Sequence, residues 1–331
     1  MKWAIGLFVW VCAIHAQSYS ITDLGMFGGN YNQAFGINAS GQVVGYSSTN
    51  VPDVFRAYMF HNGVLTDLGS LGGDYSVGTA VNANGQVAGY STLANEHYSP
   101  FLYDSGHITG LGTLGGKYAI ASGLNNLGQV VGDSHNQQEI DRAFLYSAGK
   151  MTDIGTLGGT SAAATGINNL GEITGWADRA DGFSHAFLYS AGKMIDIGTL
   201  GGFASTGYAI NDAGQIAGQA DLASGVGHAF LYTAGRMVDL GTLVPDSNSF
   251  AYALNNSGIA AGTAYVPSSG PFAVYHAVIF KGGRVIDLNK LIRRGSGGSL
   301  EAAVGINENG QVVGYGTIGG VTHSFLLTPV H

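Results

Sequence analysis

Residues 153–195 read DIGTLGGTSAAATGINNLGEITGWADRADGFSHAFLYSAGKMI, and at Asp196 the same phrase starts again. The phrase has three elements, written here as D-L-G-T-L-G-G, G-I-N-x-x-G-Q-V-V-G and H-A-F-L-Y-x-x-G. The first element starts at seven positions, which are Asp23, Asp67, Gly110, Asp153, Asp196, Asp239 and Asp287. Five of the six steps between them are 43 or 44 residues and the last is 48, which indicates one structural unit copied in tandem.

The other two elements keep the same register. The asparagine of the second element falls at Asn38, Asn82, Asn125, Asn168, Asn211, Asn255 and Asn307. The first residue of the third element falls at Arg56, Ser99, Arg142, His185, His228, His276 and His323. In the six cases available this residue lies 11 positions before the next D-L-G, and so short a fixed distance indicates a tight hairpin.

Each unit predicts four short strands, because apolar runs are separated by Gly, Asn and Ser turn signals. In the first unit Asn38 and Gly41 supply the turn that joins the first two strands. No window shows a sustained helical period, so no helix is expected after the N-terminal segment. The four predicted strands of this unit are residues 34–37, 42–46, 56–60 and 64–68.

A period of about 40 to 45 residues with four strands per unit is typical of a β-propeller blade. The seven copies predict an all-β, seven-bladed β-propeller of four-stranded antiparallel blades. The chain ends predict how the ring closes, because residues 19–25 hold a fourth strand alone and residues 305–327 hold three strands without a fourth. Together they make one blade, which leaves no free sheet edge.

The N-terminal segment differs from the repeats. Residues 1–16 contain one lysine, an apolar stretch and a final Ala16, so we predict a signal peptide cleaved after that residue. The only cysteine, Cys12, lies in this segment. Residues 17–331 are then a single β-propeller domain. The apolar stretch is short for a bilayer span, so no stable membrane anchor is expected, and an uncleaved anchor is the alternative.

The run HAFLY at residues 185–189 and 228–232, followed by DIGTLGG at 196–202, resembles the HAF-family extracellular repeats of bacteria. The resemblance covers essentially the whole chain after the signal peptide. It implies a secreted or surface protein whose molecular function is not defined. Because the chain ends at T-P-V-H, it resembles the members without a sorting segment, and we expect it in the periplasm or outside the cell.

Three short motifs suggest chemistry but have structural interpretations. Residues 132–135, Gly-Asp-Ser-His, resemble a GDS-type esterase block, yet other repeats hold varied residues at the end of the same strand. Residues 110–115 and 314–319 fit G-x-G-x-x-G, but neither opens a helix after a strand, as a dinucleotide site requires. No catalytic residue is predicted.

The repeated aspartates and histidines have two interpretations. The aspartates could form a ring of carboxylates, or they could cap turns and tie strands together. The histidines occur in four of seven repeats and could ligate a metal only by converging. We favour the structural role for both and predict no metal ligand. The phenylalanines that follow are expected in the core between blades, at Phe101, Phe144, Phe187, Phe230 and Phe325.

The connection between the second and third strands varies in every repeat and is acidic. It should share one propeller face with the connection from the fourth strand to the next unit, and loops on a rigid scaffold commonly carry binding residues. We therefore predict a ligand-binding face with Asp53, Glu96, Asp141, Asp178 and Asp181. The alternative is that these loops are only solvated. No cofactor is expected, although calcium bound by the acidic loops is a weaker hypothesis.

Two insertions, residues 263–275 and 289–300, lengthen the last full repeat on the same face. They bring aromatic rings beside positive charge, an arrangement that suits an anionic sugar or peptide. The alternative is a Gly/Ser loop without function. The predicted ligand-binding residues of these insertions are Tyr265, Tyr275, Arg293 and Arg294.

The charge balance limits the partners. With 13 basic and 21 acidic residues the net charge is −8, so no nucleic-acid partner is expected. We predict a monomeric, non-catalytic binding or scaffold module for an extracellular glycan or an envelope protein. The alternative is a secreted propeller enzyme that hydrolyses or cleaves polysaccharide. The predicted first strands, such as A-F-G-I-N and T-A-V-N, look uniform and bland near the axis, which argues against catalysis.

Overall fold

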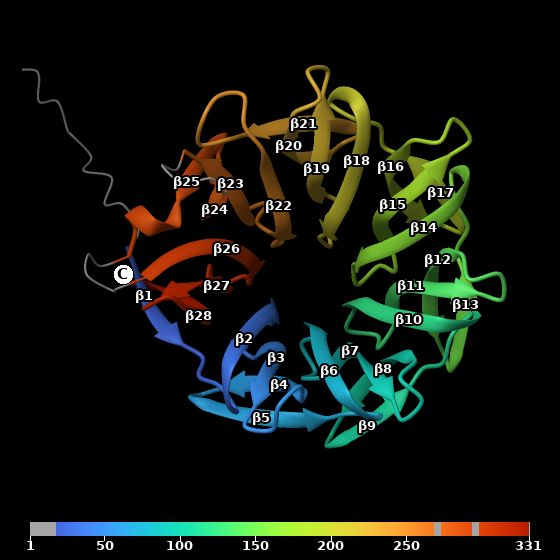
Figure 1. Ribbon diagram of the computed structural model, residues 1–331. Coiled ribbons are helices and arrows are strands. Elements are labelled where there is room, and N and C mark those ends of the chain that lie inside the picture. Colours follow the sequence, from blue (N-terminus) through green and yellow to red (C-terminus); the bar gives the residue numbers. More distant parts are fainter. Residues whose placement is uncertain (1–17, 268–272, 293–297, 331) are drawn as a thin grey trace, which may run out of the picture.

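The computed structural model describes residues 18–267, 273–292 and 298–330. These residues form 28 β-strands and one short 3-10 helix, η1 (Leu288–Lys290). The strands lie in antiparallel sets of four that stand around a central axis, which is the architecture of a β-propeller (Figure 1). The predicted signal peptide, with Cys12, lies outside the described residues.

Each set has four strand positions, counted from the axis outward (Figure 1). The innermost strands are β2 (Gly28–Ile37), β6 (Gly72–Val81), β10 (Gly115–Leu124), β14 (Gly158–Ile167), β18 (Gly201–Ile210), β22 (Ser249–Leu254) and β26 (Gly298–Ile306). The second strands are β3 (Val43–Thr49), β7 (Val87–Leu93), β11 (Val130–Asn136), β15 (Ile173–Arg179), β19 (Ile216–Leu222), β23 (Ala260–Val266) and β27 (Val312–Ile318). The third strands are β4 (Phe55–His61), β8 (Tyr98–Asp104), β12 (Asp141–Ser147), β16 (Ser184–Ser190), β20 (Gly227–Thr233), β24 (Val274–Lys281) and β28 (Val321–Val330). The outermost strands are β5 (Val64–Gly69), β9 (His107–Gly110), β13 (Lys150–Asp153), β17 (Lys193–Asp196), β21 (Arg236–Gly241), β25 (Arg284–Asp287) and β1 (Ser18–Asp23).

We call each set of four strands a blade and number the blades by their innermost strands. Blade 1 is β2–β5, blade 2 is β6–β9, and the count continues to blade 6, β22–β25. Blade 7 consists of β26, β27, β28 and the N-terminal β1. A single parallel bridge between Phe55 and Tyr75 joins blades 1 and 2 into one eight-stranded sheet.

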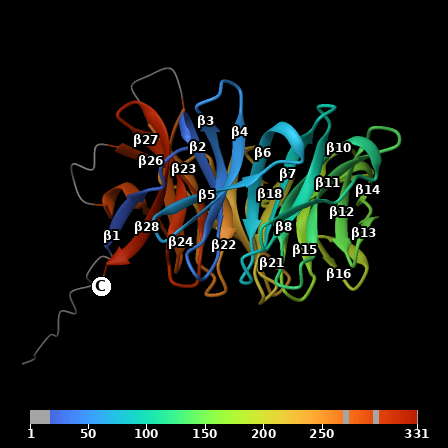
Figure 2. The same ribbon diagram turned by 90° about the horizontal axis from the view of Figure 1, so that it is seen from below.

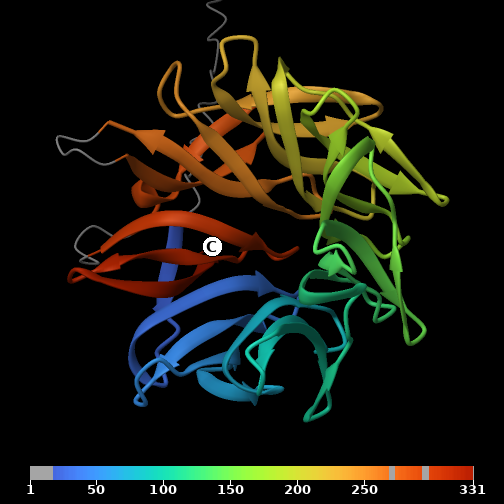
Figure 3. The same cartoon turned by 45° about the vertical axis from the view of Figure 1, so that its right-hand side comes forward.

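The ring closes through the first and last described strands. β1 pairs antiparallel with β28, with Ser18 opposite Val330 and Asp23 opposite Phe325. In Figure 3 the blue β1 lies against the red strands of blade 7. The side chain of Tyr19 is 5% exposed and packs in the core between blades 6 and 7. This is the pairing that the split repeat predicted.

The two faces of the ring differ in their connections. The loop face carries the connections from the second to the third strand and from the fourth strand to the next blade. The turn face carries the tight turns that begin at the asparagine of each G-I-N element. Figure 2 shows the ring from the side, with longer connections on one face and short turns on the other.

The innermost strands are longer than the sequence predicted. We expected the first strand of blade 1 at residues 34–37 and the second at 42–46, but β2 begins at Gly28 and β3 ends at Thr49. The glycine pair of T-L-G-G therefore belongs to the innermost strand. The pairing of β2 with β3 shifts register between Gly28 and Asn32, and such irregularities break the alternation that reveals a strand in a sequence.

The core lies between neighbouring blades rather than at the axis. Each cluster of buried side chains combines residues of two blades, as where Val131 of β11 packs with Phe187 of β16. The phenylalanines of the third element are fully buried, which confirms the predicted inter-blade core. Blade 1 has Tyr58 in this position, and its buried hydroxyl donates a hydrogen bond to Asn32 Oδ1 at 3.0 Å. A blade of this size cannot bury enough apolar surface alone, so each one depends on its neighbours.

A glycine in the middle of each second strand makes room for that core. At Gly89 a Cβ atom would overlap the carbonyl oxygen of Val77 and lie 2.6 Å from the ring of Phe101. The register of β6 and β7 shifts between Gly78 and Ala80, next to this contact. The same close approach explains the recurrence of this glycine at Gly45, Gly89, Gly132, Gly175, Gly218, Gly262 and Gly314.

The asparagines of the G-I-N elements form a ring of hydrogen bonds near the turn face. The Oδ1 of Asn125 accepts from the main-chain nitrogens of Leu127 and Gln129, at 3.1 and 3.0 Å. Its Nδ2 donates to the main-chain oxygen of Asn168 in the next blade, at 3.1 Å. Equivalent bonds link all seven asparagines, and the circuit closes where Asn307 donates to Asn38 O at 3.0 Å.

Candidate functional site

In five of the seven blades, the repeated aspartate pairs with the histidine or arginine that begins the third element. His185 Nδ1 lies 2.8 Å from Asp196 Oδ1, and Arg142 Nε lies 2.8 Å from Asp153 Oδ2. Asp196 Oδ1 also accepts a hydrogen bond from Gly198 N at 2.8 Å, which caps the turn into the next blade. The structural role predicted for these residues is therefore confirmed. The remaining histidine pairs are His228 with Asp239, His276 with Asp287 and His323 with Asp23.

Blade 2 lacks both members of this pair. Ser99 stands in the histidine position and Gly110 in the aspartate position. The two members of the pair are thus absent together in blade 2, which agrees with a local pairing role. The pairs are partly exposed, and each is expected to contribute at most about 1 kcal/mol to stability.

The predicted acidic residues lie on four different blades. Asp53 and Glu96 are exposed in turns of blades 1 and 2, where their φ angles are 60° and 64°. Asp181 is exposed in blade 4 and pairs with Arg179 Nη2 at 3.1 Å. These three residues were expected in loops, and the structure places them there.

Asp141 and Asp178 were also expected in loops, but they lie in strands. Asp141 begins β12, and Asp178 lies in β15, where its carboxylate accepts from Ser184 Oγ at 2.7 Å and from Ser161 N at 3.1 Å. The second and third strands extend further toward the loop face than their apolar residues alone suggest. Polar side chains continue these strands because that end of each blade borders solvent.

The predicted aromatic pair is brought together by blade 6. Tyr265 of β23 stands opposite Tyr275 of β24, and their ring centroids are 6.0 Å apart. Tyr275 also lines a cavity, described next. The predicted residues Arg293 and Arg294 lie outside the described residues.

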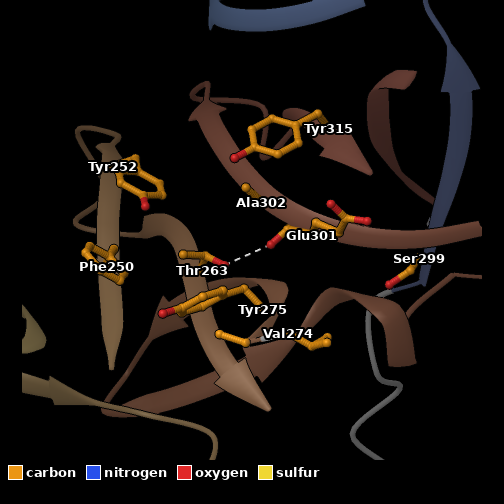
Figure 4. A pocket seen from close by; sticks show the side chains of 10 residues that line it. Phe250, Tyr252, Thr263, Val274, Tyr275, Ser299, Glu301, Ala302 and Tyr315 are labelled. Carbon is orange, nitrogen blue, oxygen red and sulfur yellow. Dashed lines mark hydrogen bonds between the residues drawn. The ribbon is translucent and has the colours of Figure 1, made fainter. Parts of the chain in front are cut away.

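A cavity of about 470 Å³ lies between blades 6 and 7, toward the loop face (Figure 4). The hydroxyl of Thr263 donates to the main-chain oxygen of Glu301 at 2.8 Å, which ties the two blades together beneath it. Among the described lining residues Glu301 is the one carboxylate, and its Oε1 accepts from Thr317 Oγ1. The aromatic residues of the walls are Phe250, Tyr252, Tyr275 and Tyr315.

The central channel joins this cavity. It encloses about 450 Å³, and Tyr252 and Tyr315 line both spaces. The ring of Tyr208 lies 5.3 Å from that of Tyr252, so aromatic surface continues along the channel wall. At one equivalent position, every innermost strand has a residue that lines the channel. These residues are Phe35, Thr79, Ser122, Thr165, Tyr208, Tyr252 and Val304.

The channel is asymmetric, so the expectation of uniform, bland first strands was wrong. Tyr208 and Tyr252 give blades 5 and 6 aromatic channel walls, whereas Thr79, Ser122 and Thr165 give blades 2 to 4 small hydroxyl groups. Each of these residues lies three positions before the repeated asparagine. The variation was visible in the sequence, but only the ring geometry shows that these positions face the axis.

A series of partly exposed rings continues from the channel across blades 1 to 3. Neighbouring ring centroids in this series are 5.0 to 6.3 Å apart. Phe35 and Tyr90 belong both to the series and to the channel lining. We call this series the aromatic ladder, and its members are Tyr31, Phe35, Tyr46, Phe55, Tyr75, Tyr90, Tyr98, Tyr118 and His135.

The ladder ends at a group of carboxylates on blade 3. His135 Nδ1 lies 2.9 Å from Glu139 Oε2, and His135 Nε2 lies 3.0 Å from Asp141 Oδ1. Burial, reinforced by the charge of Asp141, raises the pKa of Asp133 to about 7. Burial also raises the pKa of the nearby Tyr118 to about 12, and the charge of Asp133 adds to that effect. The residue that belonged to the apparent esterase block is thus a carboxyl group with an unusually high proton affinity.

Replacing Asp133 with asparagine is expected to stabilise the protein at alkaline pH. The folded state holds the Asp133 proton up to a pKa of about 7, whereas the unfolded chain releases it near the ordinary value of 3.8. The wild-type free energy of unfolding therefore falls as pH rises from about 4 to 7. The variant has no ionisable group at this position, so its free energy of unfolding does not fall for this reason. We expect a gain of roughly 2 kcal/mol at pH 8, discounted for partial solvent contact, and almost none at pH 4.

Urea unfolding of both proteins between pH 4 and pH 8 measures this difference. The matched control is Gln219→Asn at the equivalent position of blade 5, which changes no ionisable group. A pH-independent difference between Asp133→Asn and the wild type would contradict the prediction.

Sequence reasoning missed the ladder and most of the cavity. Tyr46, Tyr90 and Tyr315 occupy the position after the strand glycine, where other blades have Asp133, Trp176, Gln219 or Thr263. That variability within a fixed motif was the available signal. It was interpreted as local variation at a strand end, although the position borders the axis.

Neither a metal site nor a membrane-spanning helix is found in the part of the chain that the structure describes. Within residues 18–267, 273–292 and 298–330 no three His, Cys, Asp or Glu side chains are placed to hold a metal ion. Across those same ranges no helix has the length and apolar character needed to cross a bilayer. Calcium binding by the acidic loops stays a prediction.

Comparison with known proteins bears on the fold. No protein-family model matches the sequence, and no curated protein matches it. The structure is similar to TolB from Acinetobacter baumannii, with a TM-score of 0.51 and 11% identity. The likeness covers 93% of this chain, and this chain spans 65% of the length of the TolB chain. A weaker likeness is to a lectin from Aleuria aurantia, described as a six-bladed β-propeller, with a TM-score of 0.39, 16% identity and coverage of 77% of this chain and 94% of the lectin. Another is to AofleA from Arthrobotrys oligospora, with a TM-score of 0.42, 11% identity and coverage of 82% of this chain and 90% of AofleA. At 11% identity the likeness to TolB concerns the fold alone.

Proposed function

We propose that this chain is a secreted, seven-bladed β-propeller of the HAF-repeat type that binds a glycan without catalysis. The binding site is the aromatic cavity between blades 6 and 7 together with the channel beside it. The protein acts as a monomer in the periplasm or outside the cell. An envelope protein is the alternative partner.

The observation that carries this proposal is the chemistry of the cavity walls. Four partly exposed aromatic rings surround a space of about 470 Å³ whose only described carboxylate is Glu301. Aromatic faces pack well on the apolar C–H faces of sugar rings, and a few placed polar groups fix the orientation of a ligand. The oxygens of Glu301 and the phenol groups of Tyr252, Tyr275 and Tyr315 are suited to pair with sugar hydroxyl groups.

A direct test is retention of the mature chain on an array of bacterial and plant polysaccharides, scored together with released sugar. We expect Tyr315→Ala and Tyr252→Ala to weaken retention at least tenfold, which corresponds to about 1.4 kcal/mol each. The matched control is Phe203→Ala, because Phe203 is 65% exposed and lies outside the cavity and the channel.

The outcomes separate the candidate functions. Retention that is lost with the cavity variants and kept with the control supports the proposal. Retention that no cavity variant changes would move the site elsewhere. Sugar release that Asp141→Ala or Asp181→Ala abolishes would identify the alternative, a hydrolase or lyase. No interaction with any polysaccharide would favour the envelope protein.

A further inference from the structure

We propose that the aromatic ladder is a second binding surface that holds an extended, amino-sugar-containing glycan chain, with Asp133 receiving a protonated amino group. The proposal rests on the proposed glycan-binding function and goes further, because it names the length and the charge of the ligand. The ladder is continuous, its rings are not part of the core, and the carboxyl group of Asp133 at its end has no ion-pair partner among the described residues.

The ladder forms one uninterrupted strip from the channel to blade 3. Phe35 stacks on Tyr46 at 6.0 Å with an interplanar angle of 12°, and Tyr46 lies 5.7 Å from Tyr75 in the next blade. From there the strip passes through Tyr98 to Tyr118, whose centroids are 5.7 Å apart. Because Phe35 and Tyr90 also line the channel, a ligand in the channel can continue onto the ladder.

The ladder rings differ from the core rings of the same blades. Phe101 and Phe144 are fully buried between blades, whereas every ring of the ladder is only partly buried. The hydroxyl groups of Tyr31 and Tyr46 both donate to Gln33 Oε1, at 3.0 and 3.3 Å, which fixes these rings beside the channel. A contiguous strip of accessible aromatic surface on a soluble fold marks an interaction site.

The charge at the end of the ladder selects the kind of glycan. His135 faces Glu139 and Asp141, and Lys117 donates its main-chain N–H to Glu139. Asp133 is left without an ion-pair or side-chain hydrogen-bond partner among the described residues, beside the rings of Tyr118 and His135. In the unliganded protein Asp133 keeps its proton up to a pKa of about 7. An ammonium group beside it favours the ionised carboxylate through ion pairing, and the neighbouring aromatic faces add cation–π contact.

The occupant that fits both features is a linear glycan with free amino groups. Sugar rings pack along the aromatic strip, and an amino group meets Asp133 at its end. A proline-rich peptide also packs on aromatic grooves, but it supplies no ammonium group at regular intervals. An acidic polysaccharide would meet the carboxylates of Glu139 and Asp141 with like charge.

The test compares three hexasaccharides with the same β-1,4-linked backbone: hexaglucosamine, hexa-N-acetylglucosamine and cellohexaose. Binding of each to the mature chain is measured by titration calorimetry at pH 6.5, for the wild type, Asp133→Asn, Tyr98→Ala and Phe203→Ala. We expect hexaglucosamine to bind at least tenfold more tightly than the other two. We expect Asp133→Asn to remove that preference and Tyr98→Ala to weaken all three at least fivefold.

Tyr98→Ala could also weaken binding by disturbing the fold, so a second variant and a shorter ligand are measured as well. Tyr98→Phe keeps the ring and should bind like the wild type, and diglucosamine should lose most of the affinity because it cannot span the ladder. Phe203 lies outside the ladder, so the Phe203→Ala variant is expected to bind all three hexasaccharides like the wild type.

The outcomes distinguish this inference from the function on which it rests. Equal affinity for the three hexasaccharides, unchanged by Asp133→Asn and Tyr98→Ala but lost with Tyr252→Ala, would overturn the ladder proposal and keep the cavity as a glycan site. Binding of a ten-residue proline peptide with no affinity for any hexasaccharide would overturn both.

Discussion

Gly218→Ala is expected to lower the free energy of unfolding by about 4 kcal/mol and to leave little folded protein at 37 °C. The new Cβ would overlap the carbonyl oxygen of Thr206 and lie 2.7 Å from the ring of Phe230. Neither neighbour can move, because Thr206 belongs to the innermost strand β18 and Phe230 fills the core between blades 4 and 5. The strand pairing on both sides of Gly218 fixes the separation.

Thermal and urea unfolding of the purified variant measure this effect. The matched control is Gly182→Ala, since Gly182 has φ +89° with no atom near the position of a Cβ. An alanine in that left-handed turn costs only about 1 kcal/mol. If the two variants lost equal stability, overlap in the core would not be the reason for the repeated glycine.

Asn125→Asp is expected to destabilise the ring by about 3 kcal/mol near neutral pH. Asparagine at this position is 3% exposed and donates from Nδ2 to Asn168 O at 3.1 Å and to Gln129 Oε1 at 2.7 Å. An aspartate keeps the acceptor for the turn but places a buried carboxylate against two oxygen acceptors. The circuit of inter-blade hydrogen bonds would be opened at one of its seven links.

The neighbouring Asn126→Asp substitution is a close control. Asn126 is exposed, and its Oδ1 accepts from Ala83 N at 2.9 Å, a bond that an aspartate retains. It introduces the same negative charge one residue away, yet we expect a change below about 0.5 kcal/mol. Urea midpoints of both variants at pH 7 test this contrast, and a loss of similar size in both would show that the charge, not the lost donor, matters.

Much of the fold follows from the repeat itself. The fixed spacing of D-L-G, G-I-N and H-A-F predicted sets of four strands, the closing role of residues 19–25, and the inter-blade phenylalanines. It also predicted that Asp196 and His185 have a structural role, although not that they pair with each other. A motif residue meets equivalent neighbours in most blades, so one interpretation applies to most of its copies.

The strand ends were predicted less well. The innermost strand was expected to begin at Ala34, but β2 begins six residues earlier at Gly28. A glycine pair and a shift in register hide the alternation of apolar and polar residues there. The same error hid the residues that face the channel mouth, including Tyr31 and Gln33.

The candidate site depended on tertiary structure. Of the predicted ligand residues, Tyr275 lines the cavity and Asp141 adjoins the end of the ladder, while Asp53 and Glu96 hold tight turns. The rings of the ladder come from three blades, between Tyr31 and His135, and each one alone looks like an ordinary strand residue.

The sequence by itself therefore determined the repeat, the strand order within each blade, and the turn or core roles of the recurring Asp, Asn and Phe residues. Only the tertiary structure decided which of the variable residues share a surface. The physical reason is that recurring residues are fixed by contacts within a blade or with its neighbour, at short and constant sequence distances. The site is instead set by the closure of the ring, which brings residues as far apart as Phe35, Tyr208 and Tyr315 to one axis.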